Sequence, residues 1–169
     1  MTTEDVVTAQ RFELRASDGS LRGAWAFASD ENEQAFFLCD RHGDMRATLM
    51  VRSDGGPALV LHDQVGRMRA EVTVSKQGSA AVVLRDWEER GRAALSMEED
   101  GPTLVLTDDV GKERVEVSLR GKPMVGLRDG SERLRAVVTV TDDGVAAFGL
   151  LDEEGTLVWQ PSPYPPRPD

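Results

Sequence analysis

The feature that most constrains the fold is a pair of charged residues that recurs along the chain. Aspartates follow one another at intervals of 21 to 23 residues: Asp40, Asp63, Asp86, Asp108, Asp129 and Asp152. Arginines lie six residues after each of the first five aspartates: Arg46, Arg69, Arg92, Arg114 and Arg135. A constant period of this length is typical of proteins built from stacked structural units. The sequence therefore predicts about six tandem copies of a unit of roughly 22 residues.

Apolar residues alternate with polar ones on both sides of this frame. After Arg46 come Ala47, Leu49 and Val51, and before Asp63 comes a second alternating run that ends at Leu61. Alternation over five or six residues, rich in Val and bounded by Gly and Asp, predicts a β-strand. No window carries an apolar stripe of helical period. Each copy is therefore predicted to be a two-stranded β-hairpin, and the chain to be all-β.

Two kinds of connection join the predicted strands. The one in the middle of a copy fits a three-residue hairpin loop with Gly in the left-handed conformation. The other runs from Asp40 to Gly43, and the same loop there would place Leu38 opposite Arg46 and move the apolar set to the other face. The apolar face is kept if Asp40 opposes Met45 across a longer loop, or if the chain moves into a second sheet. We expect an antiparallel β-meander closed as a barrel or flattened sandwich, with a two-sheet β-solenoid as the alternative.

Length and composition favour one domain followed by a tail. A chain of 169 residues suits a single domain with its own core, which we place at residues 1–159. Residues 160–169 read QPSPYPPRPD, a Pro-rich segment that is unsuited to a sheet interior. We expect this segment to be an extended tail.

Charge and cysteine content exclude several kinds of partner. The formal net charge of −10 repels phosphate backbones and anionic lipids, so we expect no nucleic acid and no membrane partner. Cys39 is the single cysteine, so no internal disulfide can form. The first fourteen residues lack the basic and apolar regions of a signal peptide. We therefore expect a cytoplasmic protein.

No residue pattern indicates catalysis, a metal site or a bound cofactor. The Asp–Arg pair recurs at nearly identical sites, which favours a structural role, because catalysis needs one site that differs from the rest. Cys39, His42 and His62 are the only thiol and imidazole groups, and they lack the paired spacing of a zinc site. No nucleophile elbow, phosphate-binding loop or dinucleotide fingerprint is present. We expect the protein not to be an enzyme.

One surface is predicted to be covered. In the strands that precede each aspartate, the face opposite the main apolar set also carries apolar residues: Phe37, Val60, Val83 and Val105. A strip that is apolar on both faces is usually covered by another layer of the chain, by a second subunit or by a partner protein. These four residues are the predicted interaction surface. The sequence thus favours a non-catalytic structural or protein-interaction module that binds a protein partner or forms a homo-oligomer; the alternative is a ligand-binding module that uses the variable Asp-Gly tips.

Overall fold

All regular elements in the described residues are β-strands. The computed structural model describes residues 8–27 and 33–160, and it divides the chain into two compact units, Met1–Glu89 and Arg90–Asp169. The first unit contains β1 (Arg11–Arg15), β2 (Leu21–Phe27), β3 (Gln34–Cys39), β4 (Met45–Val51), β5 (Pro57–His62), β6 (Met68–Val74) and β7 (Ala80–Arg85). The second contains β8 (Gly91–Glu98), β9 (Gly101–Thr107), β10 (Glu113–Ser118), β11 (Met124–Arg128), β12 (Leu134–Val140), β13 (Ala146–Leu151) and β14 (Leu157–Trp159). The all-β prediction is confirmed for this part of the chain.

Two predictions about domain limits are not decided by these residues. That residues 1–159 form one domain stays a prediction. The predicted tail lies outside the described residues, apart from Gln160.

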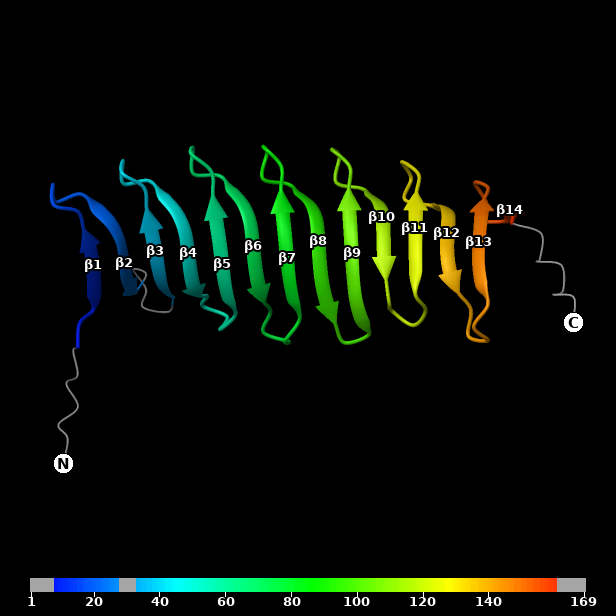
Figure 1. The fold of residues 1–169 in the computed structure, drawn as a ribbon, viewed down its shortest axis with the longest axis horizontal. Helices are drawn as coiled ribbons and strands as arrows, with labels where there is room; N and C mark the ends of the chain where they lie inside the picture. Colours follow the sequence, from blue (N-terminus) through cyan, green and yellow to red (C-terminus); the bar gives the residue numbers. More distant parts are fainter. Residues whose placement is uncertain (1–7, 28–32, 161–169) are drawn as a thin grey trace, which may run out of the picture. The chain divides into compact units, whose positions relative to one another are not determined.

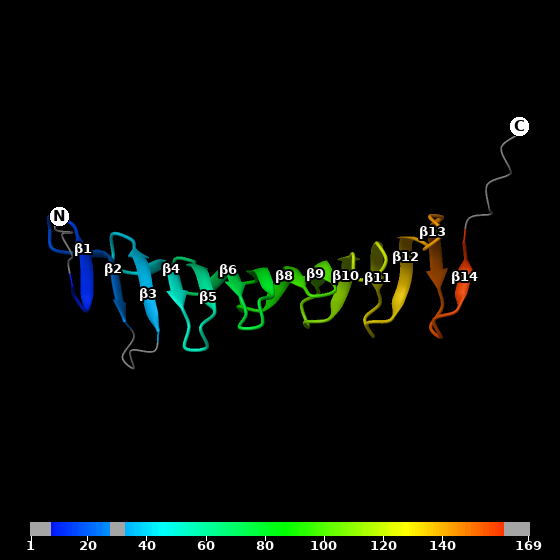
Figure 2. The same cartoon turned by 90° about the horizontal axis from the view of Figure 1, so that it is seen from below.

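Each unit is an antiparallel meander. Within a unit, every strand pairs with the strand that follows it in the chain (Figure 1). Within each unit's described residues, the strands contact only their sequence neighbours and form one layer (Figure 2). The meander prediction is therefore confirmed.

The expected closure is not found in either unit. β1 does not pair with β7, and β8 does not pair with β14, so each sheet is open and the closed barrel is not confirmed. No second layer of described strands lies within a unit, as a flattened sandwich or a two-sheet solenoid would require. Closure requires the strands to tilt and the sheet to coil back on itself, whereas these hairpins extend each sheet sideways, one strand at a time.

The same turn occurs at both ends of the hairpins. The N–H of Gly43 donates to the carbonyl of Asp40 (3.1 Å), and the N–H of Gly55 donates to the carbonyl of Arg52 (2.8 Å). Both glycines have positive φ angles, 88° and 87°, which a side chain disfavours. The three-residue loop predicted for the middle of a copy therefore also forms at the aspartate end.

The repeated arginine is the residue that keeps the apolar face constant. Cys39 lies opposite Met45, whereas Leu38 lies opposite Ala47, so Arg46 is an extra residue in a β-bulge. Arg69, Arg114 and Arg135 are extra in the same way. Neither solution expected from the sequence occurs, because the bulge restores the face that the short loop would have switched. The constant spacing of six residues is thus the distance from the start of the turn to its bulge.

In neither unit do the described residues enclose a hydrophobic core. The buried hydrophobic residues among those described are Ala24, Ala58 and Val60, and all three lie on the face that carries Glu71. We call this the Arg/Glu face. The opposite face carries Leu59, which is paired with Leu49 and Val72, and we call it the Leu/Val face. The two faces differ sharply in exposure.

Candidate interaction surface

The Asp–Arg pair ties consecutive turns together. One carboxylate oxygen of Asp40 accepts hydrogen bonds from the backbone N–H groups of His42 (2.8 Å) and Asp44 (3.2 Å), and the other accepts from Nε of Arg46 (2.9 Å). Arg46 also donates to the backbone carbonyl of Asp63, at the turn of the next hairpin along the sheet. Asp40 thus pairs with the arginine of its own copy, and that arginine in addition reaches the turn of the neighbouring hairpin.

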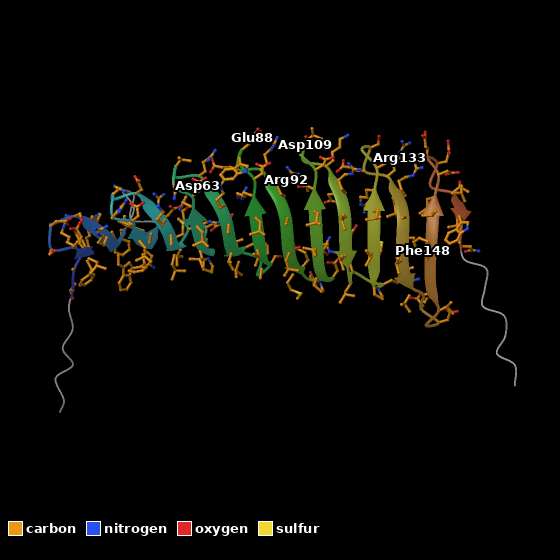
Figure 3. The ribbon with its side chains drawn as sticks, turned by 45° about the horizontal axis from the view of Figure 1, so that its top comes forward. Asp63, Glu88, Arg92, Asp109, Arg133 and Phe148 are labelled. Atoms are coloured by element: carbon orange, nitrogen blue, oxygen red, sulfur yellow. The ribbon has the colours of Figure 1, made fainter. Side chains whose placement is uncertain are left out.

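Equivalent pairs recur in both units. Arg69 donates to the carboxylate of Asp63 through Nε (2.8 Å) and Nη2 (2.6 Å), and to the carbonyl of Asp86. In the second unit, Arg114 donates to the carboxylate of Asp108 (3.3 Å) and to the carbonyl of Arg128 (2.9 Å). Figure 3 shows Asp63 in the first unit, and Asp109 and Arg133 in the second, along the turn edges of the sheets.

These carboxylates are held in the ionised form. Desolvation raises the pKa of Asp40, but the hydrogen bonds from Arg46 and from two backbone N–H groups outweigh it and lower the pKa to about 2. The pKa of Asp63 is lowered in the same way, with the backbone N–H groups of Arg67 and Val65 as the largest of the lowering causes. A general acid or base needs a pKa near the working pH, so these two groups are unsuited to proton transfer near neutrality.

The four residues predicted as an interaction surface lie on the Arg/Glu face. Val60 is 5% exposed, and Phe37, Val83 and Val105 are half-buried. In the first unit the register alternates them with polar residues, in the order Phe37, Thr48, Val60, Glu71 and Val83. Contact of these residues with a second chain stays a prediction.

The buried carboxylates on this face are paired within the chain itself. The Glu71 side chain is 9% exposed, and its two oxygens accept hydrogen bonds from Arg52 and from Nη2 of Arg85 (3.1 Å). In the second unit, Glu116 occupies the matching row and accepts a hydrogen bond from Nη2 of Arg128 (2.6 Å). Buried charges of this kind require partners, and here they have them without a second molecule.

None of the strand residues that the register places on the Leu/Val face is charged. In the first unit its strand residues are Phe12, Leu14, Gly23, Trp25, Phe27, Gln34, Phe36, Leu38, Ala47, Leu49, Val51, Pro57, Leu59, Leu61, Ala70, Val72, Val74, Ala80, Val82 and Leu84. In the second they are Ala93, Leu95, Met97, Pro102, Leu104, Leu106, Val115, Val117, Val125, Leu127, Ala136, Val138, Val140, Ala146, Phe148, Leu150 and Trp159. Gln34 is the single polar residue among them.

Most of the large side chains on this face are exposed. Their exposed fractions run from 37% for Val51 to 62% for Leu14 in the first unit, and from 37% for Leu104 to 53% for Met97 in the second. The sequence predicts a domain with its own core, and the alternating apolar residues that would form that core lie here, on an exposed face. The alternating pattern shows that one face of each strand is to be removed from water, but it does not show what covers that face. The absence of charge across all the strands is the signal that marks this face as one continuous surface in each unit.

Aromatic residues add to this face in both units. The ring centroids of Phe12 and Trp25 lie 6.3 Å apart, and those of Phe148 and Trp159 lie 5.5 Å apart in an edge-to-face arrangement. A shallow hollow of about 460 Å³ is lined by Trp25, Gln34, Phe36, Leu49, Met50, Val51 and Pro57. The remaining tryptophan, Trp87, lies in the turn after β7, with the guanidinium of Arg69 4.2 Å from its ring. Trp87 therefore belongs to the turn edge and not to the Leu/Val face.

The thiol and imidazole groups lie at ordinary positions in the hairpins. Cys39 lies opposite Met45, and His62 lies opposite Met68. His42 accepts a hydrogen bond from Nε of Arg41 (2.9 Å). Within residues 8–27 and 33–160, no group of three His, Cys, Asp or Glu side chains is placed to hold a metal ion. In the same part of the chain, no helix has the length and apolar character needed to cross a membrane.

No protein-family model matches the chain, and no curated protein matches it. The functional interpretation rests on the geometry of the two faces.

Proposed function

We propose that this protein is a non-catalytic structural or protein-interaction module, built from tandem hairpin units, whose working surface is the Leu/Val face. The observation that supports the proposal is the exposure of an uncharged, regular apolar face on a single-layer sheet. Contiguous apolar surface of this kind on a folded protein marks a site of interaction with another surface.

The energetics favour coverage of this face by protein. A half-exposed Leu or Val gains about 1 kcal/mol when the rest of its side chain leaves water, at roughly 25 cal/mol per Å². About a dozen such residues in one unit give a gross gain of order 10 kcal/mol. This gain is comparable with the cost of association, about 4–15 kcal/mol, so engagement of both units favours a stable complex.

The experiment that tests this function is site-specific photo-crosslinking in the cells that produce the protein. A photoreactive phenylalanine analogue replaces Leu59 on the Leu/Val face, and in the control it replaces Val65, which lies in a turn and is the more exposed of the two. We expect protein adducts, identified by mass spectrometry, at Leu59 and far fewer at Val65. Equal labelling at the two positions, or none at Leu59, refutes the proposed function.

A further inference from the structure

We infer that the Leu/Val face is covered by the same face of a second copy of this chain, as a face-to-face sheet pair. This inference rests on the proposed function and names the partner. Three properties of the face carry it: its relief, its lack of charge and its area.

One row of the face has a self-complementary relief. Along one row across the first unit, large Leu38, Leu61 and Leu84 on odd-numbered strands alternate with small Ala47 and Ala70 on even-numbered strands. Neighbouring strands lie about 4.8 Å apart, so in this row the leucines form ridges roughly 10 Å apart with grooves between them. In the neighbouring row of the same face the residues are large on every strand: Phe36, Leu49, Leu59, Val72 and Val82. An identical surface displaced by one strand places its ridges in these grooves, as facing layers of a packed core do.

The second unit repeats the relief with a different set of residues. Leu106, Leu127 and Leu150 alternate there with Val115 and Ala136. Because each unit carries one row of this kind, a second copy supplies a complementary row to each unit. A partner of unrelated sequence would have to match this period independently.

The lack of charge on the Leu/Val face favours this face for self-association. The chain carries a formal net charge of −10, so contact between two charged surfaces of identical copies is opposed by like-charge repulsion. The register places no charged residue on the Leu/Val face, whereas acidic residues such as Glu71 and Asp63 lie on the Arg/Glu face and at the turns. Pairing through the Leu/Val face leaves the charged groups of both copies outside the pair, in water.

The area agrees with a stable pair. A half-exposed aliphatic side chain has on the order of 50 Å² of apolar area left to bury, and about a dozen of them give roughly 600 Å² per unit. Each unit by itself thus offers an area of the same order as the roughly 800 Å² per partner of a standard interface. Packed sheets lie about 10 Å apart, a distance that interdigitated Leu and Val side chains fill.

The test uses valines that are neighbours in one strand and lie on opposite faces. In β7, Val82 lies on the Leu/Val face and Val83 on the Arg/Glu face; in β12, Val138 and Val137 form the same matched pair. Molar mass is measured by light scattering over a range of concentrations, with circular dichroism as the check on folding. We expect a wild-type dimer, a folded monomer for Val82→Lys and for Val138→Lys, and a dimer for Val83→Lys and for Val137→Lys. Because the interface is isologous, each substitution enters it twice, and we expect the dissociation constant to rise at least 100-fold.

Three outcomes overturn the inference. They are a wild-type chain that is monomeric at every concentration, an open series of larger assemblies, and dissociation by Val83→Lys but not by Val82→Lys. The last result places the interface on the surface formed by Val60 and Val83. If Val82→Lys fails to fold, Val82→Thr keeps the branched shape, and we expect at least a 10-fold weaker dimer; an unchanged dissociation constant then overturns the inference.

Photo-crosslinking separates this inference from the proposed function. A monomeric wild-type chain whose Leu59 probe labels a different protein overturns self-pairing and leaves the interaction module standing. A monomeric chain whose Leu59 probe labels no protein refutes both.

Discussion

Replacement of Glu71 by Ala tests whether the charged cluster stabilises the Arg/Glu face. The Glu71 carboxylate is almost fully buried between Arg52 and Arg85, whose side chains are 33% and 27% exposed. Removal of one member of a fully buried ion pair costs about 3–5 kcal/mol, because the charge left behind loses its partner. Here the two guanidinium groups are partly exposed and regain some hydration, so we expect a loss of about 2 kcal/mol.

Glu116 provides a graded comparison in the second unit. It occupies the matching row, its side chain is 14% exposed, and its close partner is Arg128. With a single short hydrogen bond to lose, Glu116→Ala is expected to cost about 1 kcal/mol, half the effect at Glu71. Glu71→Gln keeps an acceptor of the same shape, so its cost is expected to lie between zero and that of Glu71→Ala.

The assay is thermal and urea denaturation followed by circular dichroism at one fixed protein concentration. A loss of 2 kcal/mol corresponds to a melting temperature lower by roughly 4–8 °C for a chain of this size. A Glu71→Ala protein as stable as wild type would refute the reasoning, since it would mean that the two arginines gain nothing from this carboxylate. A larger loss at Glu116 than at Glu71 would show that the number of arginine partners does not set the cost.

Two further outcomes follow from the turns and strands. The pKa of Asp40 is about 2 in the folded protein and about 4 when unfolded, so its contribution to stability is full above about pH 4 and is lost as the pH falls toward 2; the urea midpoint measured from pH 7 to pH 2 is expected to fall in that window, and less so in Asp40→Asn. A Cβ at Gly23 would lie 2.6 Å from a backbone oxygen of β3, so Gly23→Ala is expected to cost about 1–3 kcal/mol, whereas Gly130→Ala, with open space around it, is expected to be nearly neutral in the same assay.

The sequence was sufficient to predict the strands. It did not reveal how the apolar residues of successive strands stay on the same face of the sheet. Period-two alternation around residues such as Leu49 and Leu59 predicts hairpins, and the structure confirms them. A three-residue loop at Asp40 would by itself place Leu38 opposite Arg46 and move the apolar residues of the next strand to the other face of the sheet. The bulge at Arg46 prevents this switch; it follows from hydrogen-bond register and has no separate signature in composition. The constant spacing of six residues from Asp to Arg is explained by that bulge, because it is the distance from the start of the turn to the bulged residue.

The candidate surface was less accessible to sequence reasoning. The sequence pattern shows that Leu59 and Val60 are apolar residues on opposite faces of one strand. From this pattern we predicted that the face of Val60 is the one covered by another layer or chain. In the structure Val60 is buried by its own chain, while Leu59 remains 39% exposed. The difference arises because long Arg side chains, such as that of Arg52, which donates a hydrogen bond to Glu71, cover the Arg/Glu face. Strand periodicity carries no information about that contact.

If a second copy covers the Leu/Val face, the stability of the protein depends on its concentration. The Arg/Glu face of each unit is packed by its own charged side chains, but the Leu/Val face leaves water only when a partner covers it. If that partner is a second copy, dilution favours the unfolded chain by mass action. For a chain of 169 residues the unfolding enthalpy is roughly 120 kcal/mol per copy, so the melting temperature of the wild-type dimer should rise by about 2 °C for each tenfold increase in concentration. Val82→Lys, which is expected to be monomeric, should melt at one temperature throughout the range, and below the wild type. A wild-type melting temperature that does not change with concentration, in a protein shown to be dimeric, would mean that each unit is stable with its apolar face in water.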